Sequence, residues 1–239
     1  MISLSCETST LLGSVAIHRD GQLLIEKSLM RQGSHSDSLN LLINECLHLS
    51  NLKLGEIDIF ATGLGPGSFT GIRISFNTAK TFSYVYNKPL SGADSLKNLA
   101  YLNRTLVQEN STLPQEICCA INAFKNMVYI ATYKIDQSTN SLVTLHEPQV
   151  IRVQNLNEFI KSPVLFVGDA HLTYESYLNT HLNGKLIRHA GVKDYPTADA
   201  LGQLISLENQ KSHWSKLLPL YLRASEAEEN LSGIKFQPL

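Results

Sequence analysis

The chain opens with short apolar runs separated by turn residues, which is the pattern of a β-meander. Ile2–Cys6 is a strand-like run, and Thr8–Thr10 follows it as a hydroxyl-rich turn. Gly13–His18 and Gln22–Leu29 are two more β-prone runs, and Asp20-Gly21 between them is a strong hairpin signal. The pattern predicts three strands with a polar first turn.

Two helical segments follow, separated by a strand and a loop. In Ser34–Ser50 the apolar residues fall on one broad face at about 100° per residue, and Ser34 with Asp37 resembles a capping box. Ile57–Gly63 reads as a strand and Gly65–Gly71 as a glycine-punctuated loop. Ile72–Asn87 is the second predicted helix.

The second predicted helix has two apolar faces. One stripe runs from Ile72 through Phe76, and a second patch lies on the other side with Ile74 and Val85 at its ends. A surface helix is apolar on one side only. The pattern therefore indicates a helix packed on two sides, either inside one domain or against a second subunit.

The rest of the chain alternates β and α segments. A meander followed by helix, strand, glycine loop and helix is half of a ribonuclease-H-like lobe, and the second half repeats it weakly. We expect an N-terminal lobe over residues 1–105, completed by a helix near 197–210, a smaller lobe over 106–196, and a polar tail over 224–239. The later elements expected are helices at Asp94–Asn110, Asn155–Lys161 and Thr197–Asn209, and strands at Glu116–Asn122, Met127–Ile135, Leu142–Val150 and Pro163–Val167.

Composition narrows the class of protein. The 239 residues are 43% hydrophobic and 17% charged, with a formal net charge of -1. This charge balance makes the chain a poor candidate for holding a nucleic-acid backbone alone. The four cysteines form no C-x-x-C motif, and no apolar run reaches the roughly 18 residues of a membrane span. We expect a cytoplasmic protein with reduced cysteines, no signal peptide and no membrane association.

The loop from Gly63 to Arg73, GLGPGSFTGIR, is the most informative stretch. It lacks the G-K-[S/T] ending of a Walker A loop, and Ser68 replaces the last glycine of G-x-G-x-x-G. Two interpretations stay open: a tight strand-to-helix turn capped by Ser68 or Thr70, and an anion cradle at a helix N-terminus. The residues alone favour the capped turn.

Histidine spacing bears on metal chemistry. Two metal-binding imidazoles on one helix face need a spacing such as H-x-x-x-H, and none of the eight histidines has a partner four residues away. No Ser-His-Asp or Cys-His order is recognisable. The sequence therefore predicts no catalytic residues and no metal site.

Several motifs together resemble the TsaB (YeaZ-type) family. GPGSFTGIR resembles its signature, and further matches run in order along nearly the whole chain. These are ISLSCETSTLLGSVAI, SHSDSLNLLINECL, INAFKNMVYIATY, FVGDA, YPTADALGQLI and LPLYLRASEAE.

The resemblance implies a two-lobe α/β fold of the acetate-kinase, sugar-kinase, Hsp70 and actin class. It also implies a non-catalytic scaffold that pairs with a TsaD-like catalytic subunit, on which a TsaE-like ATPase docks. The assembly transfers a threonylcarbamoyl group to the anticodon-adjacent adenosine of tRNAs that read codons starting with A. The resemblance further implies a homodimer when the chain is alone, and tRNA contact only through the complex.

The implied site residues fall into two groups. No cofactor is intrinsic, and ATP or ADP is expected at or near the partner interface. The predicted partner interface is His35, Leu39, Leu41, Leu42, Cys46, Phe69, Thr70, Arg73, Ile74, Asn77, Thr78, Thr81 and Val85. The predicted nucleotide-binding residues are Glu7, Thr8, Ser9, Thr10, Gly65, Gly67 and Ser68.

The chain departs from the family pattern at two places. Glu7 stands where many members have Asp, and Asn122-Ala123-Phe124 stands where the family has D-A-R. Two other functions stay open. A small-molecule kinase of the same fold class would need Mg-ATP at Glu7–Thr10 and a catalytic base, and a metallopeptidase-like protein would need the missing histidine pair.

Overall fold

The computed structural model describes residues 1–239 except 31–34, 137, 140, 209–210 and 225–239. The chain forms two compact units. Unit 1 is Met1–Asn98 with Tyr195–Leu220, and unit 2 is Leu99–Asp194 with the residues from Tyr221 onward. The division falls after Asn98, a few residues before the expected boundary at 105. The predicted polar tail lies outside the described residues apart from Ala224.

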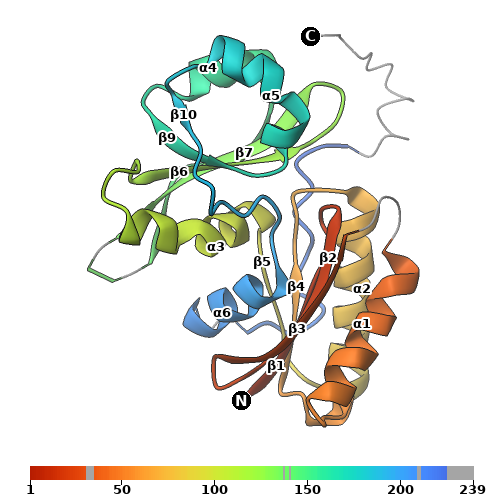
Figure 1. Ribbon diagram of the computed structural model, residues 1–239. Helices are drawn as coiled ribbons and strands as arrows, with labels where there is room; N and C mark the ends of the chain where they lie inside the picture. The colour runs from red at the N-terminus through yellow and green to blue at the C-terminus, as the bar shows by residue number, and fades with distance from the viewer. Residues whose placement is uncertain (31–34, 137, 140, 209–210, 225–239) are drawn as a thin grey trace. The chain divides into compact units, whose positions relative to one another are not determined.

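Unit 1 is built on a five-stranded sheet with the order β3-β2-β1-β4-β5 (Figure 1). β1 pairs antiparallel with β2 and parallel with β4. The strands are β1 (Ile2–Glu7), β2 (Leu12–Arg19), β3 (Gln22–Met30), β4 (Ile59–Gly63) and β5 (Leu90–Ala93).

Helices cover both faces of this sheet. α1 (Ser36–Leu49) and α2 (Phe69–Tyr86) pack on one face, and α6 (Ala198–Glu208) packs on β1, β2 and β4 from the other (Figure 1). The short 3-10 helix η1 (Leu54–Glu56) connects α1 to β4. α6 arrives from the far end of the chain to complete the unit, as expected.

The period-2 alternation of β1 decides which side chains meet which helix. Leu4 and Cys6 join the apolar core shared with α1. Ser3, Ser5 and Glu7 lie at the alternate positions and are also buried. The α6 side of the sheet is therefore buried but lined with polar groups.

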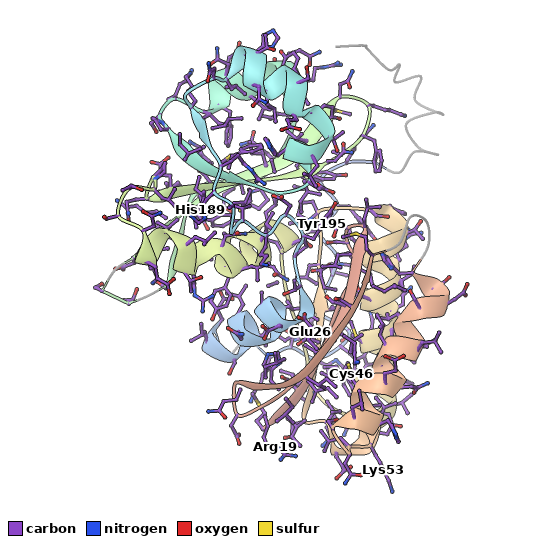
Figure 2. The ribbon with its side chains drawn as sticks, viewed as in Figure 1. Arg19, Glu26, Cys46, Lys53, His189 and Tyr195 are labelled. Atoms are coloured by element: carbon purple, nitrogen blue, oxygen red, sulfur yellow. The ribbon has the colours of Figure 1, made fainter. Side chains whose placement is uncertain are left out.

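α6 is held on this polar face by hydrogen bonds. His18 Nε2 lies 2.8 Å from Asp199 Oδ1, and Ser14 Oγ accepts from Ala198 N at 2.8 Å. Glu26 Oε1 accepts from Asp199 N at 2.9 Å, which places the labelled Glu26 beside α6 in Figure 2. Cys46 belongs to the opposite face, where its Sγ donates to Val15 O.

Unit 2 repeats the topology of unit 1. Its sheet has the order β10-β9-β6-β7-β8, with β6 antiparallel to β7 and parallel to β9. α5 packs on β6 and β9, and its buried residues lie in the same apolar core as the buried residue of α4, Leu156. The elements are α3 (Ser95–Glu109), β6 (Glu116–Asn122), β7 (Met127–Ile135), β8 (Leu142–Arg152), η2 (Val153–Asn155), α4 (Leu156–Phe159), β9 (Val164–Val167), α5 (Ala170–His181) and β10 (Leu186–Ile187).

Among the described residues, the sequence prediction missed two strands and one α-helix, β5, β10 and α5, as well as the short 3-10 helices η1 and η2. α5 buries only Ala170, Tyr174 and Leu178, and its backbone leaves helical geometry at Tyr174. So narrow an apolar stripe is a weak periodic signal. β5 and β10 are very short and take their place only by pairing in parallel with β4 and β9.

Candidate functional site: the first turn and the outer face of α1 and α2

The first turn and the glycine loop pack directly on each other, so the predicted nucleotide residues do come together. Ser68 N donates to Ser9 O at 2.7 Å, and Thr8 Oγ1 donates to Gly71 O at 2.7 Å. A Cβ on Gly67 would lie 2.3 Å from Ser9 O, and one on Gly71 would lie 2.0 Å from Thr8 O. Glycine is therefore required here for close backbone approach.

This packing gives the loop a structural role. Ser68 is the N-cap of α2, with its Oγ accepting from Gly71 N at 3.2 Å, which confirms the capped-turn interpretation. The N–H groups of Ser68 and Gly71 thus donate to protein acceptors. These two N–H groups are therefore not free to bind a nucleotide phosphate, and Thr8–Thr10 are buried.

Glu7 is a fully buried carboxyl group beneath the turn. Its Oε1 accepts from Ser9 N at 2.8 Å, and Ser95 Oγ lies 3.5 Å from Oε2. Burial raises the pKa of the Glu7 carboxyl, and the hydrogen bonds from Ser9 oppose that shift. A Cβ on Gly63 would lie 2.1 Å from Glu7 Oε2, so this glycine makes room for the carboxyl. Glu7 acts here as the cap of its turn.

The predicted partner surface on α1 is corrected by the structure. His35, Leu39, Leu42 and Cys46 are buried, the last three within the apolar core. His35 Nε2 lies 3.0 Å from Thr10 O, which ties the start of α1 to the first turn. These four residues lie on the buried side of α1, so their assignment to the partner surface is wrong.

Other predicted partner residues lie on the outer face. Leu41 of α1 is 63% exposed and Val85 of α2 is 62% exposed, although both are aliphatic. α1 and α2 pack side by side, so both helices contribute to one surface (Figure 1). Thr70, Arg73, Asn77 and Thr81 are exposed, while Phe69, Ile74 and Thr78 are half-buried.

The outer face of α2 divides into two parallel stripes. Ile74, Thr78, Thr81 and Val85 follow the spacing i, i+4, i+7, i+11, and so do Arg73, Asn77, Lys80 and Tyr84. The first stripe is aliphatic and small, and the second is cationic and aromatic. Arg73 stacks its guanidinium 3.9 Å over the ring of Phe69.

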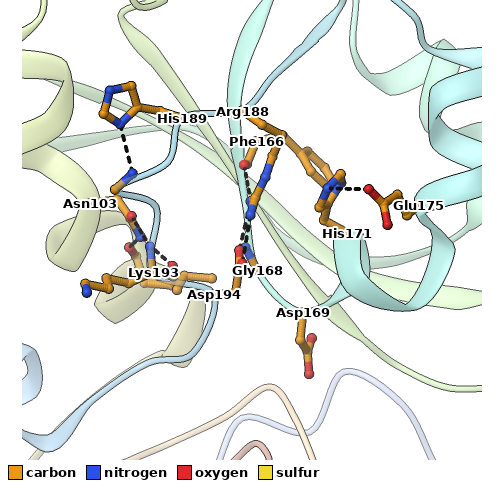
Figure 3. A network of polar contacts seen from close by, with 12 residues as sticks. Asn103, Phe166, Gly168, Asp169, His171, Glu175, Arg188, His189, Lys193 and Asp194 are labelled. Atoms are coloured by element: carbon orange, nitrogen blue, oxygen red, sulfur yellow. Dashed lines mark hydrogen bonds and ion pairs between the residues drawn. The ribbon is translucent and has the colours of Figure 1, made fainter.

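A polar network in unit 2 went unnoticed at the sequence level (Figure 3). Arg188 makes two 2.8 Å hydrogen bonds to the carboxylate of Asp194, which also accepts from Gly168 N. These contacts fix the turn that carries Asp169. Asp169 accepts from Asn122 N at 2.8 Å, and burial raises its pKa to about 6. In the sequence, only the FVGDA motif, which contains Gly168 and Asp169, pointed to this turn.

The same network explains part of the departure at Asn122-Ala123-Phe124. Asn122 Oδ1 accepts from Phe124 N at 2.9 Å and from Tyr174 Oη at 3.1 Å, two contacts that a carboxylate could equally make. Phe124, Lys125 and Asn126 all have positive φ. Arg223 donates to Ala123 O, which braces this turn.

Two absences hold for the described part of the chain. Within it, no cluster of three or more His, Cys, Asp or Glu side chains is arranged to hold a metal ion. Among the helices placed in the structure, none is long and apolar enough for a membrane crossing.

Comparison with known proteins places the chain. Residues 30–231 match the family model described as TsaD: tRNA N6-adenosine threonylcarbamoyltransferase. The tRNA threonylcarbamoyladenosine biosynthesis proteins TsaB of Bacillus subtilis and Escherichia coli are each 25% identical to it, covering 95% and 96% of this chain and 96% and 98% of their own. The chain belongs to the TsaD family and is of the TsaB/YeaZ type.

The structural comparison agrees with this assignment. YeaZ from Pseudomonas aeruginosa superposes with a TM-score of 0.74 at 21% identity, over 92% of this chain and 99% of its own. This likeness concerns the fold. The TsaB/YeaZ-type chain has the two-lobe fold predicted from its sequence, with one ribonuclease-H-like sheet in each unit.

Proposed function

We propose that this protein acts in the biosynthesis of threonylcarbamoyladenosine on tRNA, as a non-catalytic subunit that pairs with a TsaD-like transferase. Its membership of the family and the names of its TsaB relatives support the pathway. Those relatives are called biosynthesis proteins, whereas other proteins similar to part of this chain are called transferases. A TsaE-like ATPase docks on the pair in this proposal.

The observation that carries the pairing is the exposed aliphatic surface of α1 and α2. Leu41 of α1 and Val85 of α2 are both more than 60% exposed. Ile74 lies eleven residues before Val85, a spacing that puts both on the same side of α2. Exposed aliphatic side chains on neighbouring helices are typical of protein interfaces. We assign this surface to the TsaD-like subunit.

The same surface accounts for the proposed homodimer of the isolated chain. The outward residues of α1 include Asp37 and Glu45, whereas α2 has no acidic residue and carries Arg73 near its start. In a two-fold dimer, α1 of one copy can face α2 of the other, so opposite charges would meet twice. We therefore propose that a TsaD-like subunit and a second copy compete for one face.

The proposal assigns no intrinsic cofactor to this subunit. We place ATP or ADP at or near the partner interface of the assembled complex. The reason is that the first turn and the glycine loop pack closely against each other and leave little room between them. In this proposal the tRNA joins through the complex, because a chain with a net charge of -1 is a poor candidate for holding a tRNA alone.

Light scattering tests the proposal directly. The purified chain should form a homodimer alone and a one-to-one complex with a bacterial TsaD. Val85→Asp should weaken both assemblies by at least about tenfold, because it places a charge in an apolar contact. Leu207→Asp is the matched control: Leu207 is 67% exposed on α6, away from α1 and α2, and its change should leave pairing intact.

Two outcomes would contradict the proposal. One is a chain that never pairs with TsaD, and the other is a Val85→Asp variant that pairs as well as the original. Circular dichroism of each variant must show the native fold. ATP turnover by the isolated chain would instead favour the small-molecule kinase.

A further inference from the structure

A ten-residue segment after α6, residues 211–220, runs along one edge of unit 1 and is called the strap below. Ser212 exchanges two backbone hydrogen bonds with Leu90 of the edge strand β5, at 2.9 and 3.0 Å. Near its other end, Leu220 N donates to Leu64 O at 2.8 Å. Trp214 and Leu217 pack partly buried against the core. The strap is therefore anchored along its length.

The anchored strap places aromatic rings beside α2. The rings of Tyr84 and Trp214 meet edge to face, with centroids 5.1 Å apart and planes at 79°. His213 lies against the same indole at 5.0 Å. Tyr84 is nevertheless 64% exposed. An exposed ring held in place by a second ring offers a stacking surface that loses little freedom on binding.

One cationic side chain lies beside these rings, and two more belong to the strap. Lys80 Nζ lies 5.9 Å from the indole centroid of Trp214 and 5.3 Å from the ring of Phe76. Lys211 and Lys216 of the strap are exposed. The surface therefore combines rings and positive charge within one small area.

Acidic residues are missing from both segments that build this surface. The sequence has no Asp or Glu between Asp58 and Asp94, nor between Glu208 and Glu226. Two of the four acids that border these segments have lysine partners: Lys88 lies 4.0 Å from Asp58, and Lys97 forms an ion pair with Glu208. Although the chain has a net charge of -1, α2 and the strap therefore carry only positive formal charges.

This surface is separate from the face assigned to the partner subunit. Lys80 and Tyr84 belong to the cationic stripe of α2, whereas Ile74 and Val85 belong to the aliphatic stripe beside it. Changes at the strap can therefore be made without touching the aliphatic stripe.

We propose that Tyr84, Trp214, Lys80, Lys211 and Lys216 form a contact site for single-stranded RNA, with one base stacked on Tyr84 and phosphates held by the lysines. Aromatic rings between lysines suit nucleotides because each nucleotide has a flat base and an anionic phosphate. Given the proposed function, the RNA is the anticodon loop of a tRNA. The chain thus adds a direct contact to those made by its partner.

Fluorescence anisotropy with the full-length chain and a labelled, unmodified anticodon stem-loop RNA tests the site. Binding should be weak and should fall as salt rises from about 50 to 200 mM, because lysine–phosphate contacts release counterions. Lys211→Glu combined with Lys216→Glu should weaken it at least about tenfold at the lower salt concentration. Tyr84→Ala should weaken it by about tenfold, and Tyr84→Trp should retain it.

A double change of equal charge provides the control. Lys134→Glu with Lys161→Glu alters two exposed lysines of unit 2 and should leave RNA binding within about twofold, since it alters only the long-range field. Thermal unfolding should be unchanged for every variant used. Absence of RNA binding by the original chain at low salt, or equal loss in control and strap variants, would overturn the proposal.

Light scattering separates this proposal from the proposed function. The strap variants should still pair with TsaD, and Val85→Asp should lose pairing while the isolated chain still binds RNA. Strap variants that lose pairing but bind RNA normally would show that this surface contacts protein, and the RNA site would be wrong.

Discussion

At the scale of single residues, a tightly packed glycine and a buried carboxyl group have the clearest consequences for stability. Gly71 lies in the first turn of α2, where alanine would normally be favoured in a helix. Its position is instead dictated by the backbone of Thr8, which a Cβ would approach to 2.0 Å. The close approach decides the residue against its own helix propensity.

Gly71→Ala should therefore destabilise the protein although it improves helix propensity. The expected loss is about 2–3 kcal/mol, because a backbone carbonyl cannot move aside as a flexible side chain can. Urea unfolding followed by circular dichroism measures it. Gly55→Ala is the control, since a Cβ there would meet Tyr86 at an ordinary 3.7 Å and the change should be nearly neutral. Equal effects at both glycines would contradict the steric explanation.

Asp169 makes stability depend on pH. Its pKa is raised to about 6 by burial, so the folded protein holds this proton more tightly than the unfolded chain does. The stabilisation is complete below about pH 4 and is lost as pH rises through about 6. Asp169→Asn removes this loss, so from pH 4 to pH 7 the variant should gain about 2 kcal/mol relative to the original.

Unfolding free energies measured across that pH range check this prediction. Asp136→Asn is a control of opposite sign, because hydrogen bonds from Ser138 lower the pKa of the exposed Asp136 carboxyl. Its stabilising effect is lost as pH falls, not as pH rises. A flat difference for Asp169→Asn would show that folding leaves the pKa of Asp169 unchanged.

At the scale of elements, α2 presents three different sides: one to the core, one to the outer surface and one to the strap. Ile72, Phe76 and Ala79 face the interior, and Lys80 and Tyr84 meet the strap. In the aliphatic stripe Val85 is exposed, while Ile74 is half-buried and packs against the core. A helix of 18 residues offers enough turns for all three. The two apolar faces predicted from the sequence are thus present, and the second is narrower than a core face.

At the scale of the whole molecule, unit 1 is discontinuous in sequence. Residues 1–98 carry its sheet, yet α6 comes from the end of the chain and covers the polar face of that sheet. Asn98 Nδ2 donates to Thr197 O at 2.9 Å, so the two segments meet at this point. The unit closes only when both are present.

Residues 1–98 expressed alone should therefore fail to fold, because one face of the sheet would be uncovered. Residues 1–98 joined to 195–220 through a short Gly-Ser linker should fold, since the ends to be joined are adjacent in the structure. Circular dichroism and cooperative thermal unfolding distinguish the two. Cooperative unfolding of residues 1–98 alone would show that α6 is dispensable.

The sequence by itself determined most elements, the fold class and the family. These follow from local rules: apolar periodicity marked α1 and α2, Asp20-Gly21 marked the first hairpin, and a capped turn was favoured at Ser68. Such signals are carried by residues close together in the chain.

Tertiary structure alone decided which of the predicted site residues face outward. Leu39 and Leu41 look alike in sequence, but the packing of α1 on the sheet buries one and exposes the other. The strap meets Tyr84 across more than a hundred residues, and Asp194 fixes the turn of Asp169 through Gly168. Contacts of that kind depend on how distant segments fold together, so no local pattern encodes them.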